Sequence, residues 1–185
     1  MPALDKVESE ELTLTDKHGR TAEGLLLVLS QTYRWKFEST SSVEYSDGRA
    51  ILDYRNEILK QPGMQYYLAQ AEKVIALGAA SCEGVDNVEA ERARDRAEHL
   101  ASWVAEASPT PVDTHTLVLG KHLGECSGPS KETSAQRRVV LIVLLRSDPD
   151  LDTANALFRE LQALSKKTLL KIDPAHYGLF EYAPH

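Results

Sequence analysis

The pattern of apolar and polar positions predicts strands in the first part of the chain. Residues 11–22, ELTLTDKHGRTA, alternate in their first half and turn polar around Gly19, which is typical of a strand and a turn. Residues 24–39 are apolar and then alternating, so they predict a strand, with a helix left open at the start. The N-terminal part is therefore expected to be rich in strands.

The middle of the chain alternates between helical and buried-strand patterns. Ile51, Tyr54 and Ile58 share a helical face over 50–61, and Pro62-Gly63 ends or restarts that helix before a second helical run at 64–73. Runs of apolar residues predict strands at 72–81, 114–120 and 137–145, the last buried on both faces or central. The clearest helical periodicity, at 88–105, lies between the first two of these strands.

The C-terminal part predicts one more helix and an edge strand. Residues 151–164 have an amphipathic pattern that Asp150 or Asp152 is expected to cap, and residues 168–185 could add an edge strand. This order of elements predicts an α+β fold in which helices pack on one face of a mixed sheet.

Composition narrows the class of protein. A chain of 185 residues with 42% hydrophobic and 26% charged residues predicts one main globular domain, and a net charge of -7 argues against a nucleic-acid partner. No apolar run approaches the roughly 20 residues of a membrane span. The N-terminus lacks a signal-peptide pattern, so we expect the cytoplasm for the chain as written, or the periplasm if an export signal or anchor was removed. No catalytic or metal-binding motif is visible, so we expect no enzyme, cofactor or metal.

Four short motifs together resemble a known family. They are GAASCEG at 78–84, the pair Arg96-Ala97, the loop from Gly124 and Glu125 to Pro129, and R-R-V at 137–139. In this order and spacing they resemble the OmpA-like domain, a peptidoglycan-associated module. The resemblance covers residues 40–146 and implies a βαβαββ layer, with an N-terminal extension at 1–39 and a C-terminal helix and tail at 147–185.

The resemblance also implies a ligand site, and this chain departs from it. In the family an aspartate and an arginine fifteen positions apart hold the charged ends of the diaminopimelate side chain. Arg96 matches the arginine, but Ser81 stands at the aspartate position, and a hydroxyl cannot neutralise an ammonium. Glu83 could reach into the same pocket. Gln136 replaces the asparagine before R-R-V, and Arg137 completes this degenerate site.

Each arginine has a plainer interpretation. Arg96 could be a solvated helix arginine beside Arg92 and Arg94, and Arg137 could form a structural ion pair at the start of a strand. The segment Thr15-Asp16-Lys17-His18-Gly19 imitates the family's T-D-x-x-G motif, but no R-A helix follows it, so a simple turn is expected.

The resemblance brings the loops that carry Cys82 and Cys126 side by side. The two cysteines are then expected either to form a disulfide in an oxidising compartment or to remain a pair of reduced loop thiols. With His122 they could be imagined as zinc ligands, but no fourth ligand has a suitable spacing.

The sequence thus supports a functional hypothesis and an alternative. The first is a scaffold or assembly subunit of an envelope-associated or injection-type machine, with protein partners and a weakened peptidoglycan site. The alternative is a peptidoglycan-binding anchor with altered specificity that uses Arg96 with Glu83 or Ser81.

Overall fold

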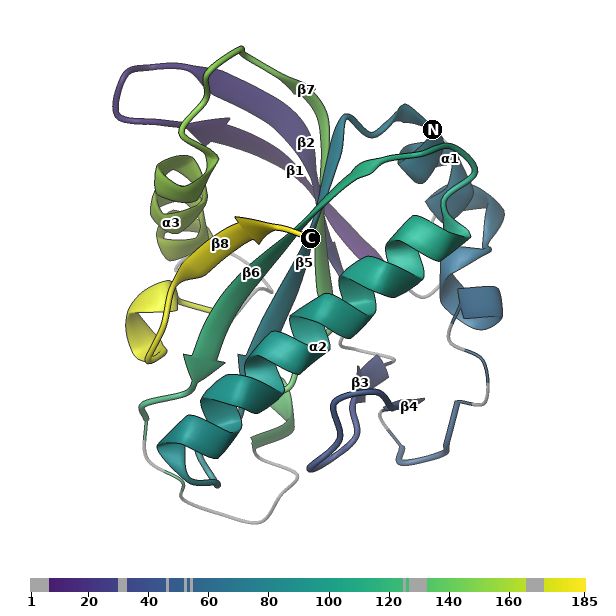
Figure 1. The fold of residues 1–185 in the computed structure, drawn as a ribbon, viewed down its shortest axis with the longest axis vertical. Coiled ribbons are helices and arrows are strands. Elements are labelled where there is room, and N and C mark those ends of the chain that lie inside the picture. The colour runs from purple at the N-terminus through teal and green to yellow at the C-terminus, as the bar shows by residue number, and fades with distance from the viewer. Residues whose placement is uncertain are drawn as a thin grey trace.

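The computed structural model describes residues 7–29, 33–45, 47–51, 53, 55–124, 126, 133–165 and 172–185. A 6-stranded sheet has the order β1-β2-β7-β5-β6-β8 (Figure 1). Its strands are β1 (Glu8–Thr15), β2 (Thr21–Val28), β5 (Lys73–Ala80), β6 (Asp113–Lys121), β7 (Val140–Ser147) and β8 (Glu181–Pro184). A separate hairpin joins β3 (Tyr33–Trp35) to β4 (Val43–Tyr45). The helices are α1 (Pro62–Gln70), α2 (Asp86–Ala107) and α3 (Thr153–Leu164), with short turns η1 (Arg55–Leu59), η2 (Thr133–Gln136) and η3 (Pro174–His176).

The centre of the sheet confirms the predicted α+β class. Strand β5 pairs in parallel with β6 and antiparallel with β7, and α2 forms the crossover between β5 and β6. A parallel pair needs such a crossover, which explains why the strongest helical pattern lies between these two apolar runs. The predicted edge strand in the tail is β8, which pairs with β6.

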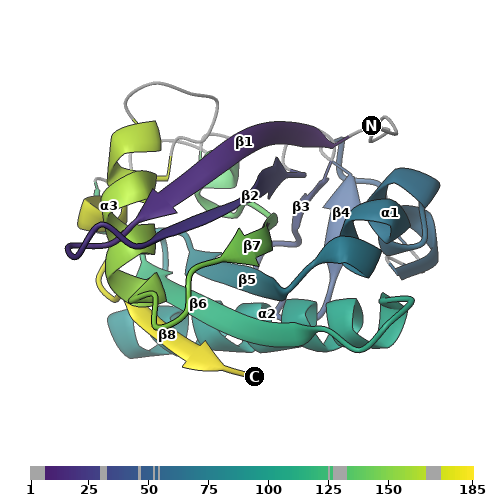
Figure 2. The same cartoon turned by 90° about the horizontal axis from the view of Figure 1, so that it is seen from above.

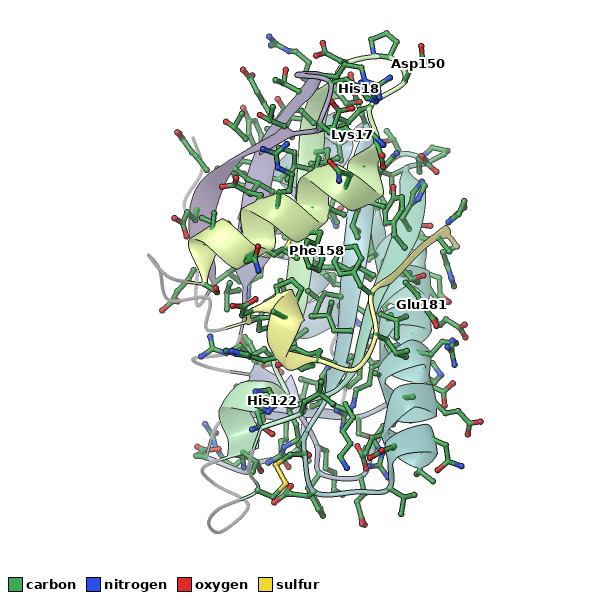
Figure 3. The ribbon with its side chains drawn as sticks, turned by 90° about the vertical axis from the view of Figure 1, so that its left-hand side faces the viewer. Lys17, His18, His122, Asp150, Phe158 and Glu181 are labelled. Atoms are coloured by element: carbon green, nitrogen blue, oxygen red, sulfur yellow. A yellow bond between two sulfur atoms is a disulfide. The ribbon has the colours of Figure 1, made fainter. Side chains whose placement is uncertain are left out.

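The helices occupy both faces of the sheet. Apolar side chains of α1, α2 and the β3–β4 hairpin form one core with one face of the sheet, whereas α3 packs with the other face (Figures 1 and 3). The expectation of helices on one face therefore holds for α1 and α2 and is wrong for α3. The reason is that β1 and β2 carry apolar side chains such as Leu12, Leu14 and Leu26 on the second face, and these need a cover.

Several predicted boundaries shift. The run 24–39 becomes β2 and the separate β3, and the helix predicted at 50–61 is reduced to η1. Pro62 restarts the chain as the first residue of α1, a position that needs no backbone N–H donor, and α1 ends at Gln70 because β5 begins at Lys73. Asp152 caps α3 by accepting a hydrogen bond from the Asn155 amide at 3.2 Å.

The segment 15–19 is the turn between β1 and β2, and it contacts the start of α3. The buried carboxylate of Asp16 accepts hydrogen bonds from the amides of His18 and Arg20, from Arg20 Nε, and from the amide of Asp152 at the start of α3. Figure 3 shows Lys17, His18 and Asp150 at the same end of the molecule, at the top of the view. Burial by itself raises the pKa of Asp16, but these hydrogen bonds outweigh it and hold the pKa well below its usual range.

Candidate functional site

The predicted site lies at the end of the sheet where β5 and β6 finish and α2 begins (Figure 1). Two glycines allow this packing. A Cβ on Gly78 would lie 1.9 Å from the Ala93 carbonyl oxygen of α2, so only glycine lets the helix approach β5 this closely. A Cβ on Gly84 would lie 1.9 Å from a carboxylate oxygen of Glu89. Both glycines of GAASCEG therefore make room for α2 and its side chains.

Arg96 is buried under the chain that links β3 and β4. The residue is 1% exposed, and its guanidinium donates to three backbone carbonyls: Nε to Ser39 O at 2.9 Å, Nη1 to Ala79 O at 2.9 Å and Nη2 to Lys36 O at 3.4 Å. It also lies over the Trp35 ring, 5.7 Å from the centroid. The interpretation of Arg96 as a solvated helix arginine is therefore wrong.

Burial and neighbouring positive charges disfavour the charged form of Arg96. Burial lowers its pKa to about 9, with help from the nearby Arg92 and Arg137, while Glu89 opposes the shift. The guanidinium still keeps its proton at neutral pH. Because the surrounding charge is already positive, the hydrogen bonds to carbonyl oxygens are what hold the cation in place.

Ser81 and Glu83 lie together on the loop after β5. Ser81 is buried, and its hydroxyl donates to Glu83 Oε2 at 3.2 Å, whereas Glu83 is exposed. Burial, and then Arg34, lower the pKa of Arg137, while Glu44 and Glu83 oppose part of this shift. The loop thus presents one exposed carboxylate near a buried arginine, and the hydroxyl at the aspartate position is already engaged.

Gln136 and Arg137 hold neighbouring segments to this loop. The side chain of Gln136 accepts from the Cys82 amide at 3.0 Å and lies 3.3 Å from Nδ1 of His122. Arg137 is 3% exposed and donates to Trp35 O at 3.1 Å, while the Trp35 amide donates to the Arg137 carbonyl. In all of these contacts Gln136 and Arg137 bond to groups of the protein itself.

A disulfide joins the two loops at this end. The sulfurs of Cys82 and Cys126 are 2.00 Å apart and their Cα atoms 5.6 Å, so this is the pair that the resemblance brought together. His122 lies at the same end of the molecule (Figure 3). Burial, and then His176, lower the pKa of His122, and its Nδ1 accepts from the Gly124 amide. Glu125 and Pro129 of the predicted loop lie outside the described residues.

Sequence reasoning missed Glu89 and the carbonyl groups around Arg96. Glu89 is 2% exposed, forms an ion pair with Arg92, and keeps its Oε2 buried without a hydrogen bond from the described part of the chain. A glutamate on a charged helix gives no sign that it will be buried. Carbonyl acceptors such as those of Lys36 and Ser39 carry no sequence signal, because every residue has one.

Two further properties concern the described residues alone. Within them, no group of three histidine, cysteine, aspartate or glutamate side chains is arranged to hold a metal ion. Of the helices in the same ranges, none combines the length and the apolar character that crossing a membrane requires.

Comparison with known proteins finds a likeness among solved structures. No known family model matches the chain, and no curated protein sequence matches it. Among solved structures, the periplasmic domain of MotB is similar, with 14% sequence identity and a TM-score of 0.37, over 86% of this chain and 83% of that one. A likeness of this size does not define the family of the chain.

Proposed function

We propose that the chain is a non-catalytic OmpA-like module that acts as a scaffold or assembly subunit of an envelope-associated or injection-type machine, and that its peptidoglycan site is degenerate. The observation that carries this proposal is the state of Arg96. Its guanidinium is buried and donates to Ser39, Ala79 and Lys36 carbonyls, so it is not presented to the carboxylate of a ligand. With this ligand site weakened, binding of partner proteins is the function that we propose for the domain.

Ser81 supports the same conclusion from the other half of the clamp. A carboxylate would hold a ligand ammonium by a charge-assisted hydrogen bond of about 1.5–3 kcal/mol. The Ser81 hydroxyl carries no charge and donates to Glu83 instead. Both charged ends of a diaminopimelate side chain thus lose the partners that the family offers.

The disulfide supports an oxidising location. Disulfides persist in compartments such as the bacterial periplasm and are rare in the cytosol. The bond between Cys82 and Cys126 joins the loop of the degenerate site to the loop after β6. We therefore propose the periplasm as the location of the working protein.

The test is co-sedimentation with peptidoglycan of the diaminopimelate type. The unmodified protein should remain in the supernatant, while an OmpA-like domain that has the aspartate and arginine pair sediments as the positive control. Ser81→Asp should also remain in the supernatant, because Arg96 remains bound to the Ser39 and Lys36 carbonyls. Saturable sedimentation of the unmodified protein would refute the scaffold function.

One observation favours the alternative, a peptidoglycan anchor with altered specificity. Glu83 is exposed and lies next to Ser81, so its carboxylate could receive an ammonium at the rim of the loop. If the unmodified protein does sediment, Glu83→Gln tests whether the Glu83 carboxylate receives the ligand ammonium. Loss of sedimentation in this variant would establish the anchor, since an exposed Glu→Gln change leaves the core intact.

A further inference from the structure

Strand β1 forms one outer edge of the sheet, opposite the edge formed by β8 (Figure 2). It is 8 residues long and pairs with β2 over its full length, from Glu8 opposite Val28 to Thr15 opposite Thr21. A long edge strand is a template on which another chain can add a strand, unless the protein covers or blocks it.

The backbone groups of β1 that point outward can be identified from the turn after it. The Asp16 amide donates to the Arg20 carbonyl at 3.0 Å, which makes these residues a hydrogen-bonded pair. Pairs in an antiparallel ladder alternate, so the even-numbered residues of β1 bond to β2. Ser9, Glu11, Thr13 and Thr15 therefore direct their N–H and C=O groups away from the sheet, and in the described ranges no group bonds to them.

The side chains of these same residues are also exposed. Leu12 and Leu14 point into the core beneath α3, so the odd-numbered side chains lie on the opposite face, where Ser9, Glu11, Thr13 and Thr15 are all solvent-exposed. A cavity of about 420 Å³ opens beside them. Its lining includes Glu11, Thr13, Glu23, Tyr67, Leu145 and Arg146. A side chain on an added strand could enter this cavity from the edge.

Charge selects the kind of strand that would fit. β1 carries Glu8, Glu10 and Glu11 and no lysine or arginine, and Glu23 lies opposite Thr13 on β2. A second copy of this chain, paired through its own β1, would bring these acids close to one another. Like charges across strands destabilise the pairing, whereas opposite charges stabilise it.

We propose that β1 is the docking edge for an extended, basic segment of a partner protein. The segment adds a strand to the sheet, bonds to the outward backbone groups of Ser9, Glu11 and Thr13, and places a lysine or arginine beside Glu11 in the cavity. The proposal rests on the proposed scaffold function and names its surface and its partner class. Its surface is separate from the loop of the degenerate peptidoglycan site, so the two can fail independently.

The experiment is selection of a displayed random octapeptide library on the purified full chain, followed by titration of a synthetic enriched peptide. We expect enriched peptides to be rich in lysine or arginine. In amide NMR spectra they should shift the signals of Ser9, Glu11 and Thr13 and slow their hydrogen exchange. Glu11→Gln should weaken binding several-fold, and binding should fall as salt is raised.

Backbone specificity is tested at Thr13. Thr13→Pro removes an outward N–H without removing a bond to β2, so it should fold and bind at least ten-fold more weakly. Thr13→Val keeps the N–H and is the matched control, with unchanged binding. The melting temperature of each variant shows that the fold is retained.

Four outcomes would overturn the proposal. They are no enrichment, enriched peptides without basic residues, equal binding by Thr13→Pro and Thr13→Val, and a homodimer whose interface is β1. Peptidoglycan sedimentation tests the scaffold function separately, because no outcome of the peptide experiment depends on Arg96 or Ser81.

Discussion

Replacement of Arg96 by methionine should destabilise the protein even without any ligand. The change leaves the Ser39 and Ala79 carbonyls, each 2.9 Å from the guanidinium, without their donors, and the longer bond to Lys36 is also lost. Two hydrogen bonds from a charged donor contribute about 1.5–3 kcal/mol each, and the cost of burying the guanidinium offsets part of this. We expect the free energy of unfolding to fall by roughly 3–5 kcal/mol.

Urea unfolding at neutral pH, followed by circular dichroism and extrapolated to water, measures this difference. The melting temperature should fall by roughly 10 °C, since about 1 kcal/mol corresponds to 2–4 °C in a chain of this size. Arg94→Met is the matched control. Arg94 lies on the same helix with 40% of its side chain exposed and pairs with Glu181, so its loss should lower the unfolding free energy by less than about 1 kcal/mol.

A loss below about 1 kcal/mol for Arg96→Met would refute the structural role. It would mean that Arg96 is free to move in solution, as an arginine waiting for a ligand would be. Equal losses in the Arg94 and Arg96 variants would point to helix propensity or charge as the cause.

Other regions give further predictions. Thiol titration of the denatured protein should find no free thiol until reductant is added, and free thiols in oxidised, freshly purified protein would contradict the disulfide. Cys126→Ser should lower the free energy of unfolding by up to about 4 kcal/mol, since the Cys82–Cys126 bond spans a sequence separation of 44. Gly78→Ala should lower the melting temperature by well over 5 °C because its Cβ meets the Ala93 carbonyl oxygen, and an unchanged value would show that α2 can shift away. Because the pKa of Asp16 is lowered in the folded protein, its carboxylate stabilises the fold above the unfolded pKa of about 3.9, and this stability is lost as pH falls below that value. In Asp16→Asn the loss of stability in acid should be smaller. Identical acid unfolding curves for the two proteins would exclude this role.

The sequence predicted the centre of the fold because burial leaves a clear pattern there. Strands β5 and β7 are buried on both faces, so nearly every residue is apolar, and α2 shows a helical stripe between two such runs. The face on which α3 packs could not be predicted, because amphipathicity shows that a helix has a buried side and does not show what it packs against. The turn at 15–19 was recognisable from its polar residues and Gly19.

The candidate site was predictable in its location and less so in its chemistry. The family resemblance implied which loops lie side by side, and Cys82 and Cys126 do lie together in the structure. The partners of Arg96 are carbonyls on the chain between β3 and β4, a segment that no motif connects to α2. Whether an arginine faces a ligand or the backbone thus depended on a loop path that the sequence does not encode in any recognisable motif.

The order of strands in the sheet bears on how the protein folds. The β1–β2 hairpin is local, but β2 completes its pairing only with β7, where Leu26 lies opposite Ile142. Contacts between residues so distant in the chain slow folding, because a long loop must close before the pairing stabilises it. During synthesis the hairpin emerges first, and the edge of β2 that will pair with β7 stays exposed until β7 has been made. A chaperone that binds the open edge of β2 should therefore associate with nascent chains that end before residue 140 and release those that contain β7.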